Sequence, residues 1–305
     1  MLPTSIARVS VTASLALMAA AATAGSQPPT RSHTLAGVSY VIRVGGAPAT
    51  GNGMAAAMPS QTPNYTANAI FAAGRGRLDV VDGGVESLFT KGDYVLFDST
   101  DLVIVHPATH EFIALPQDAA SRRMDQLQAR GMKLSISDVK VSMDSLPGTD
   151  TIAGHPTRRF RMTTAFTMTV DAGALQQRLT TESVTDYWTA TVPGLPGNPL
   201  LRANGFSGSP ATTGMFKDLS SRIDSAAAQI GSAVALRTVT SSRLTQGLES
   251  TLQMQQTSEV SDLKNREVDE SLLLLPPGYK PGAVPGLDTA EARDAGAKWR
   301  VRPKG

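Results

Sequence analysis

An alternation of apolar and polar side chains between Arg159 and Val170 constrains the fold of this chain more than any other stretch. One side of the pattern carries Phe160, Met162, Phe166, Met168 and Val170, and the other carries Arg159, Arg161, Thr163, Thr167 and Thr169. Side chains alternate across a β-strand, so the stretch predicts one long strand with a dry face and a wet face. A parallel strand covered on both faces would be apolar throughout, so the pattern favours an antiparallel sheet.

The dry face of this strand is rich in Met and Phe, which leaves two interpretations open. Methionine is flexible and polarisable, so such a face can accommodate an apolar ligand, or it can be an ordinary core. Trp188 and Met254 add large apolar side chains from two later segments that are expected to be strands. The candidate ligand-binding residues are Phe160, Met162, Phe166, Met168, Trp188 and Met254.

The order of the expected elements indicates an α+β fold, with helices packed on one face of a curved antiparallel sheet. Strands are expected over residues 32–44, 65–73, 76–81, 94–98, 102–106, 110–115, 133–146, 159–170, 181–192, 233–244, 250–264 and 272–275. Apolar residues at three- and four-residue spacing predict a helix over 213–230, and Asp118 and Gly131 bound a shorter one. Residues 45–63 are expected to be a loop, and residues 32–279 a single domain.

The first 24 residues have the pattern of a secretory signal peptide. Arg8 precedes an apolar run over 9–22, and Ala22-Thr23-Ala24 provides small residues for cleavage. The run is short for a membrane-spanning helix, although an uncleaved N-terminal anchor is the alternative. Residues 25–31 would be a linker, and the mature protein is expected to be exported, most simply to the periplasm, without a membrane span.

The composition of the chain excludes several classes of function and of chemical site. The 305 residues contain no cysteine, which excludes disulfides, thiolate metal ligands, a cysteine nucleophile and a lipid-modified cysteine behind the leader. The formal net charge is only +2, and no clustered basic face indicates nucleic-acid binding. Beyond Tyr279, the Pro, Gly and charged residues of 280–305 predict a disordered basic tail.

Several short motifs together carry a resemblance to a known group of proteins. They are Gly74-Arg75-Gly76-Arg77-Leu78-Asp79, Gly92-Asp93-Tyr94-Val95-Leu96-Phe97-Asp98, Thr151-Ile152-Ala153-Gly154-His155-Pro156-Thr157-Arg158-Arg159-Phe160, Thr185-Asp186-Tyr187-Trp188 and Leu274-Leu275-Pro276-Pro277-Gly278-Tyr279. Over residues 32–279 the chain resembles an uncharacterised bacterial envelope family with an architecture like the lipoprotein carrier LolA and the lipid-binding LppX. That resemblance implies a curved antiparallel half-barrel with helices on its concave side, which holds acyl chains or senses envelope lipids.

The motifs for catalysis or metal binding are weak. His106, His110 and Glu111 could contribute to a zinc site, but Pro107 indicates a hairpin between the two histidines, and three or four converging ligands are usual. His155 lies in a Gly-His-Pro turn without a recognisable nucleophile. The Gly74-Arg75-Gly76 stretch joins two strands, whereas dinucleotide binding needs a following helix. We therefore expect no enzyme activity, cofactor or metal.

Basic and aromatic residues offer two other candidate sites. Arg158, Arg159 and Arg161 could bind a lipid headgroup or an acidic partner at a rim, or they could form a solvated strand face. Trp188 could lie at a pocket mouth or in the core, and the basic residues around Trp299 could touch an anionic surface or be solvated.

The sequence thus leads to two hypotheses about function. In the first, an exported, non-catalytic binding protein holds an apolar or acyl-bearing ligand in the concavity of a half-barrel. The alternative is an envelope protein–protein interaction module whose sheet is plugged by its own segments and holds no ligand.

Overall fold

The computed structural model describes residues 33–51, 63–85, 88–99, 101–116, 131, 133–171, 176–201, 217–246, 250–282 and 297–299. All of them belong to one compact unit, Ser32–Gly305. Among these residues, no helix is long and apolar enough to cross a membrane. The fold is β-rich, as the alternating sequence patterns predict.

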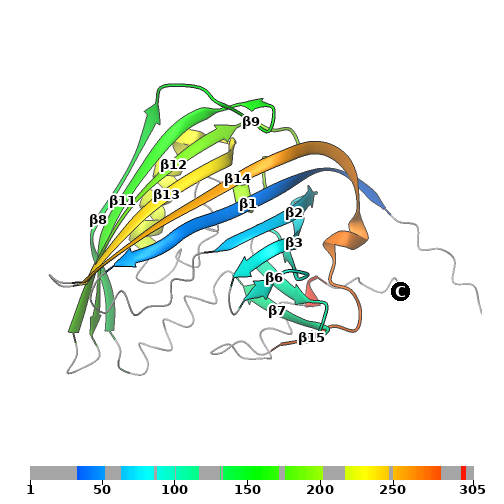
Figure 1. The fold of residues 1–305 in the computed structure, drawn as a ribbon, viewed down its shortest axis with the longest axis horizontal. Helices are drawn as coiled ribbons and strands as arrows, with labels where there is room; N and C mark the ends of the chain where they lie inside the picture. The colour runs from blue at the N-terminus through cyan, green and yellow to red at the C-terminus, as the bar shows by residue number, and fades with distance from the viewer. Residues whose placement is uncertain are drawn as a thin grey trace, which may run out of the picture. The chain divides into compact units, whose positions relative to one another are not determined.

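Most of the described residues belong to one large, curved sheet, in which nearly every pair of neighbours is antiparallel (Figure 1). Its strands in spatial order are β15 (Lys280–Pro281), β7 (Glu111–Pro116), β6 (Asp101–His106), β5 (Tyr94–Phe97), β3 (Arg75–Val85), β2 (Asn64–Ala72), β1 (Thr34–Gly51), β14 (Ser250–Asp269), β13 (Val234–Gln246), β12 (Gln176–Ala190), β11 (Arg158–Asp171) and β8 (Lys133–Leu146). β4 (Phe89–Thr90) pairs with β3, and β9 (Thr151–Ile152) pairs with β10 (His155–Pro156) in a separate hairpin. Only the pair β15–β7 is parallel among those described.

The long alternating stretch forms β11, which confirms the predicted antiparallel strand. Its register with β12 runs without a shift from Arg158↔Thr189 to Asp171↔Gln176, whereas its register with β8 shifts between Ala165 and Thr167. Thr167, expected on the wet face, is buried. We call the face that carries Phe160 and Met162 the inner face and the opposite one the outer face. The registers carry the inner face across the sheet through Tyr187 of β12 to Val44 of β1.

The inner face from β1 to β6 holds the largest core cluster. Apolar side chains on it include Tyr40, Phe71, Leu78 and Phe97. Gly76 of β3 is paired with both Phe71 and Phe97, and the two rings stack with centroids 6.2 Å apart. A Cβ on Gly76 would lie 2.0 Å from the Phe97 ring, so glycine is required for this stack.

The segment after β12 packs against this inner face. Leu195 and Leu201 are fully buried in the same cluster, and the latter ends the 3-10 helix η2 (Pro199–Leu201). The buried Asn198 Nδ2 donates to Tyr40 Oη at 2.8 Å. Burial raises the pKa of the Tyr40 hydroxyl far above its ordinary value, so it stays protonated. This part of the sheet is therefore filled by the chain itself.

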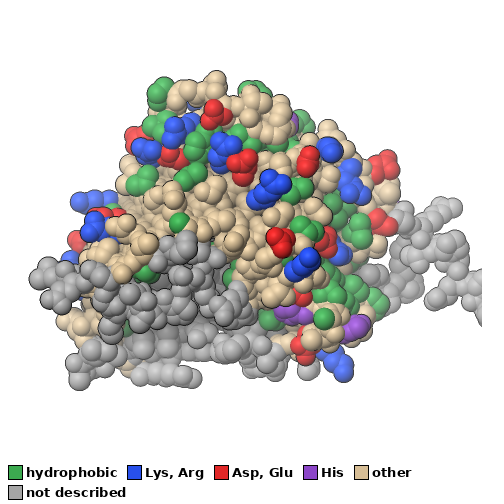
Figure 2. Space-filling view, viewed as in Figure 1, with side chains coloured by type: hydrophobic (Ala, Val, Ile, Leu, Met, Phe, Trp, Pro, Cys, Tyr) green, Lys and Arg blue, Asp and Glu red, His purple; other side chains and the backbone are tan. Residues whose placement is uncertain are grey.

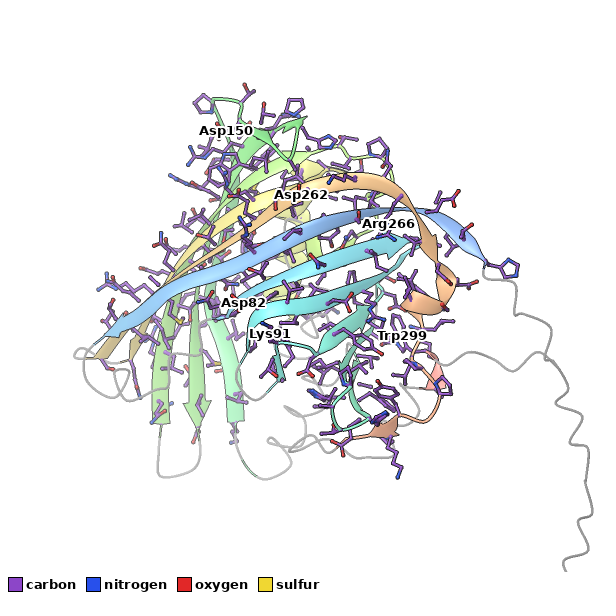
Figure 3. The ribbon with its side chains drawn as sticks, turned by 45° about the vertical axis from the view of Figure 1, so that its right-hand side comes forward. Asp82, Lys91, Asp150, Asp262, Arg266 and Trp299 are labelled. Atoms are coloured by element: carbon purple, nitrogen blue, oxygen red, sulfur yellow. The ribbon has the colours of Figure 1, made fainter. Side chains whose placement is uncertain are left out.

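Strand β5 is buried on both faces, whereas Ile113 and Leu115 on the inner face of β7 are half-buried. On the outer face, Leu96, Val105 and Phe112 pack with Leu275 and Trp299 from the C-terminal part of the chain, where Figure 3 labels Trp299. The Leu275 amide donates to the Trp299 carbonyl at 2.7 Å. At these described positions the chain is packed, which differs from the solvated tail expected after Tyr279.

Helix α2 (Lys217–Ala227) and the 3-10 helix η5 (Ala228–Ile230) lie within the range predicted to be helical. Ile223, Ala226 and Ile230 pack against Met143, Phe160 and Met162 on the inner face. This contact places helical residues against the Met- and Phe-rich face of β11. The shorter helix expected over 118–131 lies outside the described residues, apart from Gly131.

Two expectations about element boundaries are wrong. β1 continues to Gly51, which pairs with Leu252, so residues 45–51 are strand and not loop. A last strand is expected over 272–275, but Leu272 and Leu273 belong to the 3-10 helix η6 (Glu270–Leu273). Leu274 and Leu275 follow this helix. Asp269 caps that helix by accepting from the Ser271 amide at 2.9 Å, which favours a turn over continued pairing.

Candidate functional site

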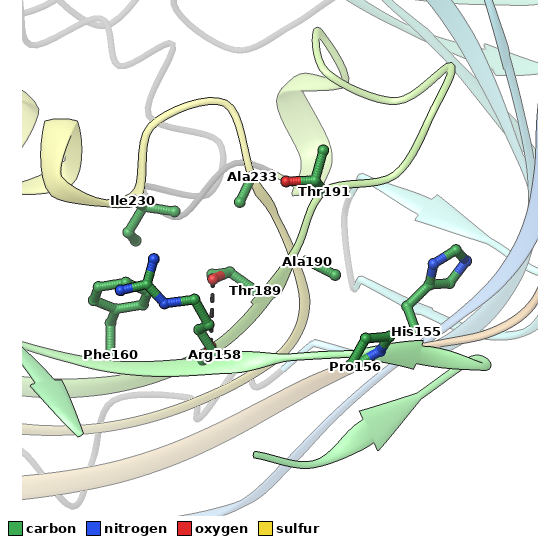
Figure 4. Close-up of a pocket in the computed structure, with 9 residues that line it drawn as sticks. All are labelled: His155, Pro156, Arg158, Phe160, Thr189, Ala190, Thr191, Ile230 and Ala233. Atoms are coloured by element: carbon green, nitrogen blue, oxygen red, sulfur yellow. Dashed lines mark hydrogen bonds between the residues drawn. The ribbon is translucent and has the colours of Figure 1, made fainter. Parts of the chain in front are cut away.

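A pocket of about 340 Å³ lies where β11 and β12 approach the end of η5 (Figure 4). Strand β10, which leads directly into β11, supplies one wall through His155 and Pro156. Thr157 fixes this junction, since its amide and hydroxyl both donate to the Asp150 carbonyl, at 2.8 and 2.9 Å. These two hydrogen bonds connect the residue before Arg158 to the segment that precedes β9.

Apolar side chains make up more than half of the pocket lining. They are Pro156, Phe160, Ala190, Ile230 and Ala233. Phe160 and Ile230 are almost completely buried, with 3% and 8% of their surface exposed. Because these side chains are held in the core cluster beneath α2, the apolar floor exists before any ligand arrives.

The polar lining comes from His155, Arg158, Thr189 and Thr191. The Thr189 hydroxyl donates to the Arg158 carbonyl at 3.3 Å, which ties β12 to the start of β11. The Arg158 guanidinium lies over the Phe160 ring, 5.3 Å from its centroid, and Figure 4 shows it beside Ile230. His155 lies at the other end of the pocket, beyond Ala190. The site combines an apolar floor with one exposed cation.

The three arginines predicted to form one rim cluster are divided between the two faces. Arg158 is on the inner face, whereas Arg159 and Arg161 lie on the outer face and share the carboxylate of Asp186. The Arg161 hydrogen bond lowers the pKa of Asp186 below its ordinary value, burial opposes this effect, and Arg159 adds to the lowering. Two of the three arginines are therefore paired within the sheet, and they share the single negative charge of Asp186.

Trp188 belongs to the outer face, so the structure does not bring it to the apolar floor. It pairs with Arg159 on one side and with Arg237 on the other. The two guanidinium groups lie 4.8 and 5.5 Å from the centroid of its ring, and the indole N–H donates to Asp150 at 2.6 Å. These contacts indicate that Trp188 has a structural role on the outer face.

A row of paired side chains extends from Trp188 across the outer face. Arg237 bonds Glu259 of β14 at 2.8 Å, and Glu259 is opposite Arg43 of β1. Figure 2 shows Lys or Arg and Asp or Glu side chains interspersed over the side of the sheet that faces the viewer. Residues of opposite charge that lie opposite each other on neighbouring strands form cross-strand pairs on a solvated face.

The remaining candidate ligand residues occupy the inner face but differ in exposure. Met162 is buried with Met143 beneath the helix, Phe166 and Met168 are half-buried, and Met254 of β14 is 39% exposed. Polar side chains lie between them, because the neighbouring strands contribute Ser183, which hydrogen-bonds Ser242, and Thr185, which hydrogen-bonds Thr240. The six residues therefore do not form one continuous apolar lining.

Sequence reasoning missed Thr189, Ala190, Ile230 and Ala233 as pocket residues. Ile230 ends the apolar stripe of the predicted helix, but its position against Phe160 depends on a long-range contact. Thr189 is recognisable only once its pairing with Arg158 is known.

The two histidines considered as metal ligands, His106 and His110, contact different residues. His106 Nδ1 contacts Asp93 Oδ2 at 3.0 Å, while His110 lies in the hairpin turn with its ring 5.3 Å from that of Tyr279. His106 is paired with Glu111 across the strands. Over the part of the chain that the structure describes, no group of three His, Cys, Asp or Glu side chains could hold a metal ion.

Comparisons with known proteins add no family to this geometry. No protein-family model matches the chain, and no curated protein matches it in sequence.

Proposed function

We propose that this chain is an exported, non-catalytic binding protein that holds an apolar or acyl-bearing ligand. The observation that carries the proposal is the pocket with a buried floor of Phe160 and Ile230 under a short helix. Its volume of about 340 Å³ is at the lower end of the range for small-molecule sites, roughly 300–1,000 Å³. It suits one short chain or the end of a longer one.

The resemblance to LolA- and LppX-like half-barrels supports the same function. A curved antiparallel sheet with a helix on its inner face is the arrangement that this resemblance implies. Burial of a ligand chain against the floor would contribute about 0.8 kcal/mol per methylene, so affinity needs no reactive group. The signal-like first 24 residues support export to the envelope as part of this proposal, with the periplasm as the simplest location.

A second candidate function is an envelope interaction module with no ligand. The segment that contains Leu195, Asn198 and Leu201 favours it, because this segment fills the inner face over β1. A sheet filled in this way would present its outer face to a partner. The two candidates differ in whether the pocket near α2 takes up an apolar molecule.

Ala233→Trp tests the proposal, since the indole would occupy the pocket from its lining. Titration with a fluorescent fatty acid should show saturable uptake by the unchanged chain and at least a tenfold loss in Ala233→Trp. Val184→Trp is the matched control, because Val184 is exposed on the outer face of β12. Equal uptake by Ala233→Trp and the unchanged chain would contradict the pocket as the site, provided that circular dichroism shows both folded.

A further inference from the structure

Arg158 differs from the other arginines of its strand in having no acidic partner. Arg159 and Arg161 both bond Asp186, and Arg237 on β13 bonds Glu259. Among the residues that the structure describes, no carboxylate forms an ion pair with Arg158. On β11, the two outer-face arginines are thus paired with a carboxylate and the inner-face Arg158 is not.

The surroundings of Arg158 strengthen this contrast. No Asp or Glu lines the pocket, whose polar groups are the guanidinium, one imidazole and two threonine hydroxyls. The Thr189 hydroxyl already donates to the Arg158 carbonyl, the imidazole and the Thr191 hydroxyl can donate or accept, and the guanidinium can only donate. A ligand group that satisfied the guanidinium would be an acceptor, and one that also compensated its charge would be an anion.

The backbone of Arg158 is fixed while its guanidinium is accessible. Its carbonyl accepts from Thr189, and the preceding residue is anchored to Asp150. Its side chain is exposed and lies along the Phe160 ring. A ligand with its chain on the floor would therefore have its polar end within reach of a positioned cation.

We infer that the pocket binds an amphiphile whose polar end is an anion, either a carboxylate or a phosphate, held by Arg158. This inference rests on the proposed function and adds the chemistry of the headgroup. Both anions match the planar donors of a guanidinium, which can bind two oxygens at once. Thr191 also lines the pocket and adds a hydroxyl group to it. The apolar chain of the ligand lies against Phe160 and Ile230.

The test uses four probes that share an eight-carbon chain: octanoate, octyl phosphate, octanol and octyltrimethylammonium. Isothermal titration calorimetry on the full chain should show that one or both anions bind about tenfold more tightly than octanol, and the cation most weakly. Arg158→Gln should reduce the affinity for the anions to that for octanol, while octanol binding stays unchanged. Arg158→Lys keeps the charge and should retain part of the preference.

Arg243→Gln is the matched control, since Arg243 is exposed on the outer face of β13. It should leave all four affinities unchanged. A preference for octanoate supports a carboxylate ligand such as a fatty acid, and a preference for octyl phosphate supports a phosphate-bearing lipid or metabolite.

Two results would overturn the inference in distinguishable ways. Equal binding of anions and octanol, unchanged by Arg158→Gln, would show that Arg158 does not recognise the headgroup, although the apolar site would stand. Failure of all four probes to bind would overturn the proposed function together with this inference.

Discussion

Asp186 connects the charges of the outer face at the scale of single residues. Its carboxylate accepts from Arg161 at 2.6 and 2.9 Å and also from Arg159, which in turn lies over Trp188. Only 11% of the Asp186 side chain is exposed. A carboxylate held in this way stabilises the fold only while it is ionised, because its partners are permanent cations.

The stability contributed by Asp186 should depend on pH. Its folded-state pKa is lowered below the unfolded value, which is about 3.9 for aspartate. The contribution is therefore complete above about pH 4 and is lost as pH falls through the lowered folded-state pKa. Asp186→Asn should be less stable than the unchanged chain at pH 7, and this difference should shrink toward pH 2 in urea unfolding experiments.

Asp138→Asn provides the comparison for that experiment. Asp138 pairs with Arg178 at 3.3 Å, but both side chains are more than half exposed. Exposed pairs contribute little, so the free energy of unfolding should change by less than about 1 kcal/mol at any pH. A difference between Asp186→Asn and the unchanged chain that stayed constant from pH 7 to pH 2 would contradict the assigned role.

At the scale of elements, the C-terminal residues cover the outer face of β5 to β7. Trp299 is 1% exposed and contacts the cluster of Leu96 and Phe112. Lys298 beside it bonds Asp98 and Asp101 at 2.8 and 2.7 Å. Burial opposes its charge, but the two carboxylates more than offset this effect and raise the pKa of Lys298.

Trp299→Ala should destabilise the protein by about 3–5 kcal/mol, the usual cost of removing a large buried aromatic side chain. Urea unfolding would measure this loss. Leu272→Ala should cost much less, because Leu272 is 38% exposed and leaves no cavity. A loss below about 1 kcal/mol for Trp299→Ala would show that this cover contributes little to the fold.

The sequence predicts some features of the secondary-structure elements and not others. Alternation identified β11 and its two faces, because the strand pairs with β12 without a bulge. It could not place Trp188 relative to Phe160, since a shift of one residue in pairing exchanges the faces of a whole strand. The burial of Trp299 could not be predicted for another reason. A single buried side chain in a Pro- and Gly-rich stretch produces no periodic pattern in the sequence.

At the scale of the whole molecule, one curved sheet is used in three ways. From β1 to β6 its inner face is filled by the chain's own Leu195 and Leu201, and from β5 to β7 its outer face is covered by Trp299. Near β11 and β12 the pocket lies beside the helix. Composition and strand order predicted the β-rich class, whereas the division into filled and open regions depends on contacts between distant segments.

Native mass spectrometry on the protein purified from the cells that produce it, followed by organic extraction, tests the central claim most directly. The proposed binding function predicts a population heavier than the polypeptide by one small amphiphile, which the extract would identify as a carboxylate or a phosphate. A polypeptide mass alone, together with no uptake of added fatty acid, would contradict the claim and favour the interaction module.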